Sequence, residues 1–205
     1  MIAINADAET REAYVQNIIR VYDDATPDQE HVGRNWYRTA HDMAEMLADG
    51  DARTGAGLLA AFSPQTAWWL NVQLAADAYE TGTPRGHVGD ALSKAARILA
   101  GISPEDVLPM TRKTGQFYLL ILDPEDPEAV CIDRHAHDVA VGMAYGDLPR
   151  GLSAKGRYAL LAHCYREAAQ RLGELPSTVQ AVTWIVWRDG LVGQGTRGDT
   201  FTERD

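Results

Sequence analysis

Two residues of opposite charge, Lys113 and Asp133, each stand beside an apolar segment, an arrangement that can support catalysis. The helix expected to begin at Lys113 continues into apolar residues 117–120, and a lysine withdrawn from water can supply a nucleophilic amine. Asp133 follows apolar residues 130–132 and opens the next expected helix, whose dipole favours a negative charge there. One helix and one turn separate the two residues, so we expect the returning chain to bring the amine and the carboxylate together.

Simpler interpretations stay open for the same residues. Asp133 can serve as a helix N-cap and Lys113 as a solvated residue at a helix start, while residues 63–65 can be an ordinary helix break. Two of the six histidines, His135 and His137, are two positions apart, which directs them to different faces of a helix. Because the sequence contains no H-E-x-x-H motif or comparable ligand spacing, we expect no metal site.

The composition is that of a globular protein that builds its own core. The chain has 205 residues, 45% of them hydrophobic, which is enough for one domain, placed at residues 1–189. Residues 190–205 are rich in glycine, threonine and charge and are expected to form a flexible tail. Cys131 and Cys164 are too few for an iron–sulfur cluster, and neither a P-loop nor a G-x-G-x-x-G motif occurs. Without a signal peptide or a long apolar run, the sequence predicts a cytoplasmic protein with no membrane partner.

The acidic charge is concentrated near the N-terminus. The formal net charge is −10, and residues 1–51 hold 11 acidic against 4 basic side chains, whereas residues 52–205 hold 18 against 15. This balance argues against a general nucleic-acid coat protein, because neutralising phosphates requires clustered Lys and Arg. The larger, nearly balanced part of the chain can still present a modest basic face.

Hydrophobic periodicity predicts an all-α protein of about eight to ten helices, without a convincing alternating strand pattern. Thr66, Asp90 and Asp133 are the expected N-caps of three of these helices. The expected helices span residues 8–22, 36–48, 56–62, 66–79, 90–100, 104–108, 113–122, 133–145, 153–172 and 177–188.

Four segments, taken in order, resemble the helix-hairpin-helix DNA glycosylase superfamily of the endonuclease-III type. The resemblance covers about residues 55–145 and implies an all-α glycosylase-like domain, here without the family's iron–sulfur cluster. The segments are an apolar helix with a Ser-x-Gln turn at 58–66, a helix around Lys94, a Leu-Pro hairpin running into Arg-Lys-Thr at 108–114, and the Ile-Asp-Arg-His motif at 132–135.

The resemblance also implies roles for individual residues. Lys113 would attack the sugar or act as a cation, Asp133 would stabilise the cationic transition state, and the target base would be flipped out of the stack. Gln65 corresponds to the residue that approaches the DNA, and Trp68 or Trp69 could help to fill the vacated gap. The implied partner is DNA with a damaged or modified pyrimidine, no cofactor is implied, and the DNA-binding residues would be Gln65, Trp68, Trp69, Arg112, Arg134 and His135.

Residues 31–48 and 158–188 are similar to a smaller branch of this superfamily found in phages and actinobacteria. Relatives of that branch have been proposed to act in thymine hypermodification, which implies base modification, an amine co-substrate and, for a phage protein, the host cytoplasm. Met110 and Thr111 stand where the family has hairpin glycines. That departure and the acidic N-terminus keep open a non-catalytic relative that binds DNA or a host protein.

Overall fold

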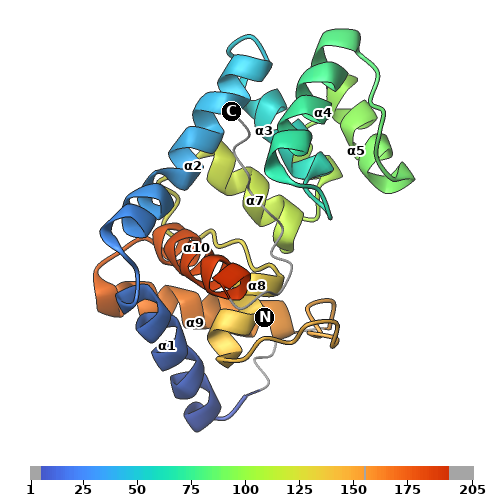
Figure 1. Cartoon of the computed structure of the whole chain (residues 1–205). Helices are drawn as coiled ribbons and strands as arrows, with labels where there is room; N and C mark the ends of the chain where they lie inside the picture. Colours follow the sequence, from blue (N-terminus) through green and yellow to red (C-terminus); the bar gives the residue numbers. More distant parts are fainter. Residues whose placement is uncertain (1–5, 155, 194–205) are drawn as a thin grey trace. The chain divides into compact units, whose positions relative to one another are not determined.

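The computed structural model describes residues 6–154 and 156–193, and this part of the chain is all-helical, as predicted. Ten helices and no strand occur in it (Figure 1). They are α1 (Ala8–Asp23), α2 (Pro27–Leu47), α3 (Ala52–Phe62), α4 (Trp68–Thr81), α5 (Gly89–Leu99), α6 (Pro104–Val107), α7 (Lys113–Leu122), α8 (Arg134–Val141), α9 (Arg157–Leu172) and α10 (Pro176–Gly193). Among the described residues, no helix is long and apolar enough to cross a membrane.

The helices group into two compact units, and the boundary between them falls inside α2. We call residues 6–36 with 125–193 the terminal unit and residues 37–124 the central unit. Each unit has its own buried side chains and is described by itself. The expected single domain over residues 1–189 stays a prediction, and residues 194–205 of the expected tail lie outside the described residues.

In the terminal unit, α1, α8, α9 and α10 pack on one another around an apolar core. The largest fully buried side chains there include Ile18 of α1 and Leu161 and Tyr165 of α9. Gly33 of α2 lies against the backbone of Val182 in α10, where an added Cβ would collide with main-chain atoms. The glycine therefore permits the close approach of α2 and α10 within this unit.

In the central unit, α3 is the core helix and contacts α4, α5, α6 and α7. Every residue from Gly55 to Phe62 is buried, as expected for a short helix that is apolar on all sides. A Cβ at Gly55 would collide with the carbonyl of Ala44 in α2. The two helices thus cross at a distance that only glycine allows.

The start of α2 corrects the sequence prediction, which treated residues 23–28 as a break and began the helix near Trp36. The helix begins at Pro27, with Thr26 and Gln29 forming a reciprocal cap. The Gln29 side chain accepts from the Thr26 N–H at 3.0 Å, and the Thr26 hydroxyl accepts from the Gln29 N–H at 3.3 Å. This is a capping box followed by proline at the first helical position, a signal present in the sequence.

Two expected N-caps are wrong. Helix α4 begins after Ala67 rather than Thr66, whose hydroxyl instead bonds the Pro64 carbonyl and His87. Helix α5 begins after Val88, so Asp90 lies in its first turn and pairs with Lys94 at 2.6 Å. In both cases the side chain has a partner that competes with the cap.

Three helix ends also differ from the prediction. Helix α8 ends at Val141 because Gly142 takes the left-handed conformation with φ +76°, and α9 begins only after Gly156, at φ +89°. Helix α10 continues to Gly193, beyond the expected end at Arg188. The expected positions were Tyr145 for the end of α8 and Ser153 for the start of α9.

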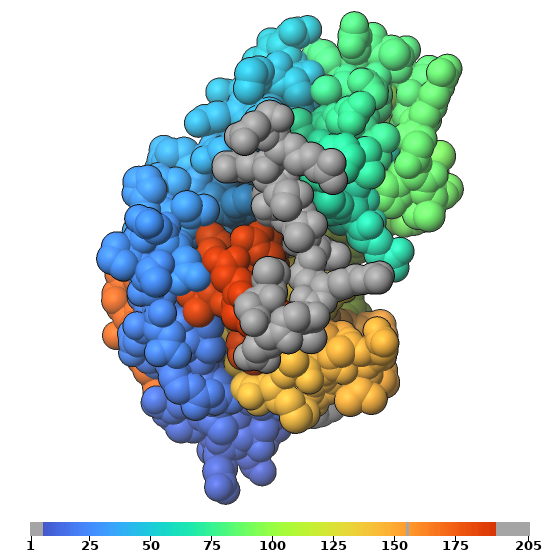
Figure 2. Space-filling model, in the orientation of Figure 1, coloured from blue at the N-terminus to red at the C-terminus, as the bar shows by residue number. Residues whose placement is uncertain are grey.

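Some of the N-terminal acidic charge is neutralised within the terminal unit. Helix α1 lies at the surface (Figure 2), and both carboxylate oxygens of its Glu12 accept from Arg171 of α9 at 2.7 Å. The hydrogen bonds from Arg171 lower the pKa of Glu12 to about 2. In α2, Arg34 bridges Glu30 and Glu174. These pairs offset part of the negative charge that the sequence concentrates near the N-terminus.

Candidate functional site

Asp133 is the N-cap of α8, as predicted, and its carboxylate is held at both oxygens. Oδ1 accepts from the backbone N–H groups of His135 and Ala136, each at 2.9 Å. Oδ2 accepts from the indole Nε1–H of Trp184 at 3.0 Å. The residue is half-buried, and these three hydrogen bonds orient its carboxylate.

The extended segment that leads to Asp133 is fixed by a tyrosine from α9 that sequence analysis missed. The Tyr158 hydroxyl accepts from the Ile132 N–H at 2.9 Å and donates to the Val130 carbonyl at 3.0 Å. Burial raises the pKa of this phenol well above its usual value, so it stays neutral. The Tyr158 hydroxyl thereby satisfies two backbone groups of a buried segment that has no helix or strand bonds of its own.

Lys113 begins α7, as predicted, and Arg112 is its N-cap residue, so two basic side chains stand at the positive end of this helix. Both are half-buried. The Arg112 side chain makes no cap hydrogen bond, and the first turn contains no acidic residue. This is the reverse of the usual preference for acidic residues at a helix start.

A short turn connects α6 to α7, with the Arg112 N–H donating to the Pro109 carbonyl at 2.9 Å. The Gln116 side chain donates to the Met110 carbonyl at 2.8 Å, and the Tyr118 hydroxyl donates to Glu105 of α6 at 2.7 Å. Gly115 lies directly against this turn, where an added Cβ would collide with the Met110 Cα and the Pro109 carbonyl oxygen. The first residues of α7 are thus packed against the backbone of the turn, at a position that only glycine allows.

Replacing Gly115 by alanine should lower the free energy of unfolding by about 1–3 kcal/mol, because the atoms in its way are backbone and cannot turn aside. Urea unfolding followed by circular dichroism measures the change. Gly89→Ala is the matched control, since a Cβ there meets nothing within 4 Å. The control should be neutral or stabilise by up to about 1 kcal/mol. Equal stabilities for the two variants would contradict the close backbone contact at Gly115.

Gln65 occupies the turn between α3 and α4 in a left-handed conformation, with φ +57°. Its side chain is exposed. Among the described residues, Asp49 is the other non-glycine residue with positive φ. Such a conformation costs about 1–2 kcal/mol for most residues and persists where the surroundings impose it.

His87, from the segment between α4 and α5, holds this turn in place. Its Nε2 lies 2.7 Å from the Thr66 hydroxyl and 3.0 Å from the Pro64 carbonyl oxygen. Its Nδ1 accepts from the Val88 N–H at 2.8 Å, so the ring proton belongs on Nε2. A second hydrogen bond joins the two helices that flank the turn: the Asn71 amide of α4 donates to the Leu59 carbonyl of α3 at 3.0 Å. Sequence analysis did not identify His87 or Asn71.

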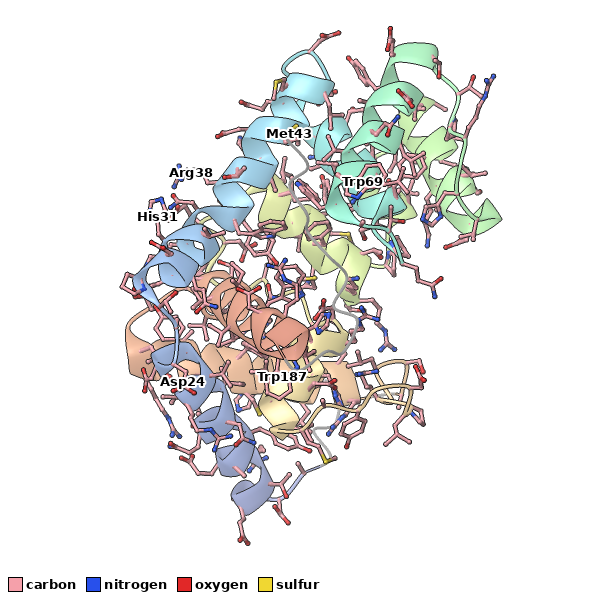
Figure 3. The ribbon with its side chains drawn as sticks, in the orientation of Figure 1. Asp24, His31, Arg38, Met43, Trp69 and Trp187 are labelled. Carbon is pink, nitrogen blue, oxygen red and sulfur yellow. The ribbon has the colours of Figure 1, made fainter. Side chains whose placement is uncertain are left out.

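The two predicted tryptophans differ in exposure. Trp69 lies on α4 (Figure 3). It is 58% exposed, which is unusual for the largest aromatic side chain. Trp68 is half-buried and packs edge-on against Phe117 of α7, with ring centroids 6.3 Å apart. Trp69 is therefore the better placed of the two to stack on a ligand.

The remaining predicted residues lie in α8 beside Asp133. Arg134 is exposed and its Nε donates to His135 Nε2 at 3.2 Å. His135 is buried and lies edge-on to the Trp184 ring, with centroids 6.0 Å apart. Asp133, Arg134 and His135 belong to the terminal unit, whereas Gln65, Trp68, Trp69, Arg112 and Lys113 belong to the central unit. The pairing of Lys113 with Asp133 stays a prediction.

A buried ionic cluster next to His135 was also missed. Asp138 of α8 accepts two hydrogen bonds from the Arg150 guanidinium, both at 2.7 Å, one from the Tyr145 N–H and one from the neighbouring ring of His137. His137 lies on a different face from His135, as their spacing predicted, and its Nε2 is 3.0 Å from Arg157. The cluster ties the loop between α8 and α9 to α8.

No group of three or more metal-ligating side chains occurs in the described part of the chain.

Comparison with known proteins identifies the family to which this chain belongs. A family model described as a family of unknown function, DUF7178, matches residues 1–191. The chain belongs to the DUF7178 family. No curated protein and no solved structure matches it. The residues that the match spans include Gln65, Lys113, Asp133 and Trp184, so the features described above belong to the family region of the chain.

Proposed function

We propose that this DUF7178 protein acts on a flipped-out nucleobase in DNA, either excising the base or replacing an activated group on a modified pyrimidine. The observation that carries the proposal is the turn at Gln65. The backbone of Gln65 is left-handed, and the hydrogen bonds of His87 and Thr66 hold the turn in which it lies. The planar amide of the Gln65 side chain is exposed. Strained backbone that is imposed by its surroundings and points a polar side chain to solvent is typical of functional positions.

Gln65 and Trp69 have the chemistry that base flipping requires. Extruding a nucleotide leaves a gap in the stack that a planar side chain can fill, and an exposed indole can stack on a base. At the start of α7, Arg112 supplies positive charge for the phosphate backbone. The order of the motifs, which resembles that of the helix-hairpin-helix DNA glycosylases, supports a DNA-binding role for these residues.

Asp133 and Lys113 are the proposed reacting groups. Loss of a base gives the sugar oxocarbenium character, which the Asp133 carboxylate would stabilise while the Lys113 amine attacks the anomeric carbon. In the base-modification form of the proposal, Asp133 would accept a proton from an incoming amine and Lys113 would neutralise the leaving group.

Borohydride trapping tests the proposal and separates its two forms. The protein would be incubated with duplex and single-stranded DNA containing uracil, hydroxymethyluracil or a mismatch. A covalent adduct that is lost in Lys113→Ala supports glycosidic chemistry, and intact strands with a mass-shifted base support modification. If Lys113→Ala and Asp133→Asn retain the full biological effect of the wild type, the chain is a non-catalytic relative and the proposal is wrong.

A further inference from the structure

We propose that Trp184 of α10 is a positioning residue that orients the Asp133 carboxylate for the reaction. This inference rests on the function proposed above. It starts from the 3.0 Å hydrogen bond that the Trp184 indole donates to Oδ2 of Asp133, across 51 positions of the sequence. Both residues lie in the terminal unit, so the contact belongs to one compact body.

The hydrogen bonds of Asp133 divide its carboxylate into a structural and a reactive oxygen. Oδ1 receives two backbone N–H groups and is saturated as the cap of α8. Oδ2 receives the indole N–H, and a carboxylate oxygen can accept two hydrogen bonds. Trp184 therefore fixes the rotation of the carboxylate about its last bond and leaves one acceptor position of Oδ2 for a substrate.

The Trp184 ring is itself held by three neighbours. Trp36 of α2 packs against it with centroids 5.9 Å apart, and His135 meets it edge-on at 6.0 Å. The guanidinium of Arg188, one turn further along α10, lies 4.7 Å from the ring centroid. A ring constrained in this way can hold a carboxylate more firmly than an exposed hydroxyl or amide could, because it loses little freedom in forming the bond.

Trp187 provides a matched control on the same helix. It lies three residues after Trp184 on α10 (Figure 3), packs partly against the apolar core, and has a buried Nε1 without a hydrogen-bond partner. Replacing either tryptophan by phenylalanine preserves an aromatic ring and removes one N–H group. Trp184→Phe therefore removes a hydrogen bond to Asp133, whereas Trp187→Phe removes an N–H group that has no hydrogen-bond partner.

Trp184→Phe should lower kcat on the DNA substrate by about 10–100-fold and leave KM nearly unchanged. This fold-change corresponds to the free energy of one hydrogen bond to a charged group. Trp187→Phe should leave both constants at their wild-type values. Circular dichroism and thermal unfolding of both variants check that the fold is retained. A Trp184→Phe enzyme with wild-type kcat would overturn the inference while leaving the proposed function intact.

A second measurement tests the hydrogen bond without any DNA. The variant is Asp133→Ser, whose hydroxyl keeps a capping oxygen for α8 but is too short to reach the Trp184 indole. The measurement is the 1H–15N NMR spectrum of the full chain, which contains a signal from each indole N–H group. The Trp184 Nε1–H signal should move upfield and exchange faster with solvent, while the Trp187 signal stays in place. An unchanged Trp184 signal would refute the positioning role. A wild-type protein inactive on every DNA tested would instead refute the proposed function, whatever the NMR shows.

Discussion

Replacing Asp138 by alanine should destabilise the protein by about 3–5 kcal/mol, the usual cost of removing one partner of a buried ion pair. The Asp138 carboxylate is 97% buried and accepts four hydrogen bonds, two of them from Arg150, whose side chain is 16% exposed. Its loss removes the carboxylate that balances the charge of Arg150, which keeps a hydrogen bond to the Gly146 carbonyl at 3.1 Å, and removes the acceptor of the His137 Nδ1–H. Urea unfolding at pH 7 measures the change.

Asp90→Ala is the control for this substitution, because the Asp90 side chain is 76% exposed and pairs with Lys94 on the surface of α5. It should cost about 0.3–0.5 kcal/mol. Similar losses for the two variants would show that the Asp138 cluster does not hold the loop between α8 and α9.

The same carboxylate should also affect stability at acid pH. Burial raises the pKa of Asp138, but the hydrogen bonds from His137, Arg150 and the Tyr145 N–H outweigh it and lower the pKa from 3.8 to about 2. The unfolded state therefore binds this proton more readily than the folded state does. The stabilisation of the folded state by the ionised Asp138 carboxylate is complete above pH 4 and is lost as the pH falls towards 2. Between pH 4 and 2, the wild type should lose stability more steeply than Asp138→Ala.

Replacing Asp133 by asparagine should reduce activity by about 10²–10³-fold while leaving the fold intact. The negative charge that would stabilise a cationic transition state is removed, whereas asparagine still caps a helix through its Oδ1. Its Nδ2 group then faces the Trp184 indole N–H, so the hydrogen bond from Trp184 is lost together with the charge. Steady-state kinetics on the DNA substrate and thermal unfolding separate these two effects.

Asp51→Asn makes the same chemical change at another helix start. The Asp51 carboxylate caps α3 by accepting from the Thr54 N–H at 3.1 Å. Its variant should keep wild-type activity, because nothing in the proposed reaction uses it. An Asp133→Asn protein as active as Asp51→Asn would mean that the charge of Asp133 has no part in the chemistry.

Local features of the chain could be predicted because they depend on neighbours in sequence. Helix α7 runs from Lys113 to Leu122 and Asp133 caps α8, both as expected. The start of α2 was missed although its capping box, Thr26 to Gln29, was present in the sequence. The end of α8 and the start of α9 were misplaced because glycine takes left-handed backbone there, at Gly142 and Gly156.

By itself, the sequence determined an all-helical chain, most of its helices and the placement of Lys113 and Asp133 at two helix starts. The tertiary structure decided which distant groups meet: Trp184 with Asp133, His87 with the Gln65 turn, and Asp138 with Arg150. The reason is physical. Helix periodicity and caps follow from residues three or four apart, whereas these contacts depend on how helices cross and where loops return, which no local pattern encodes.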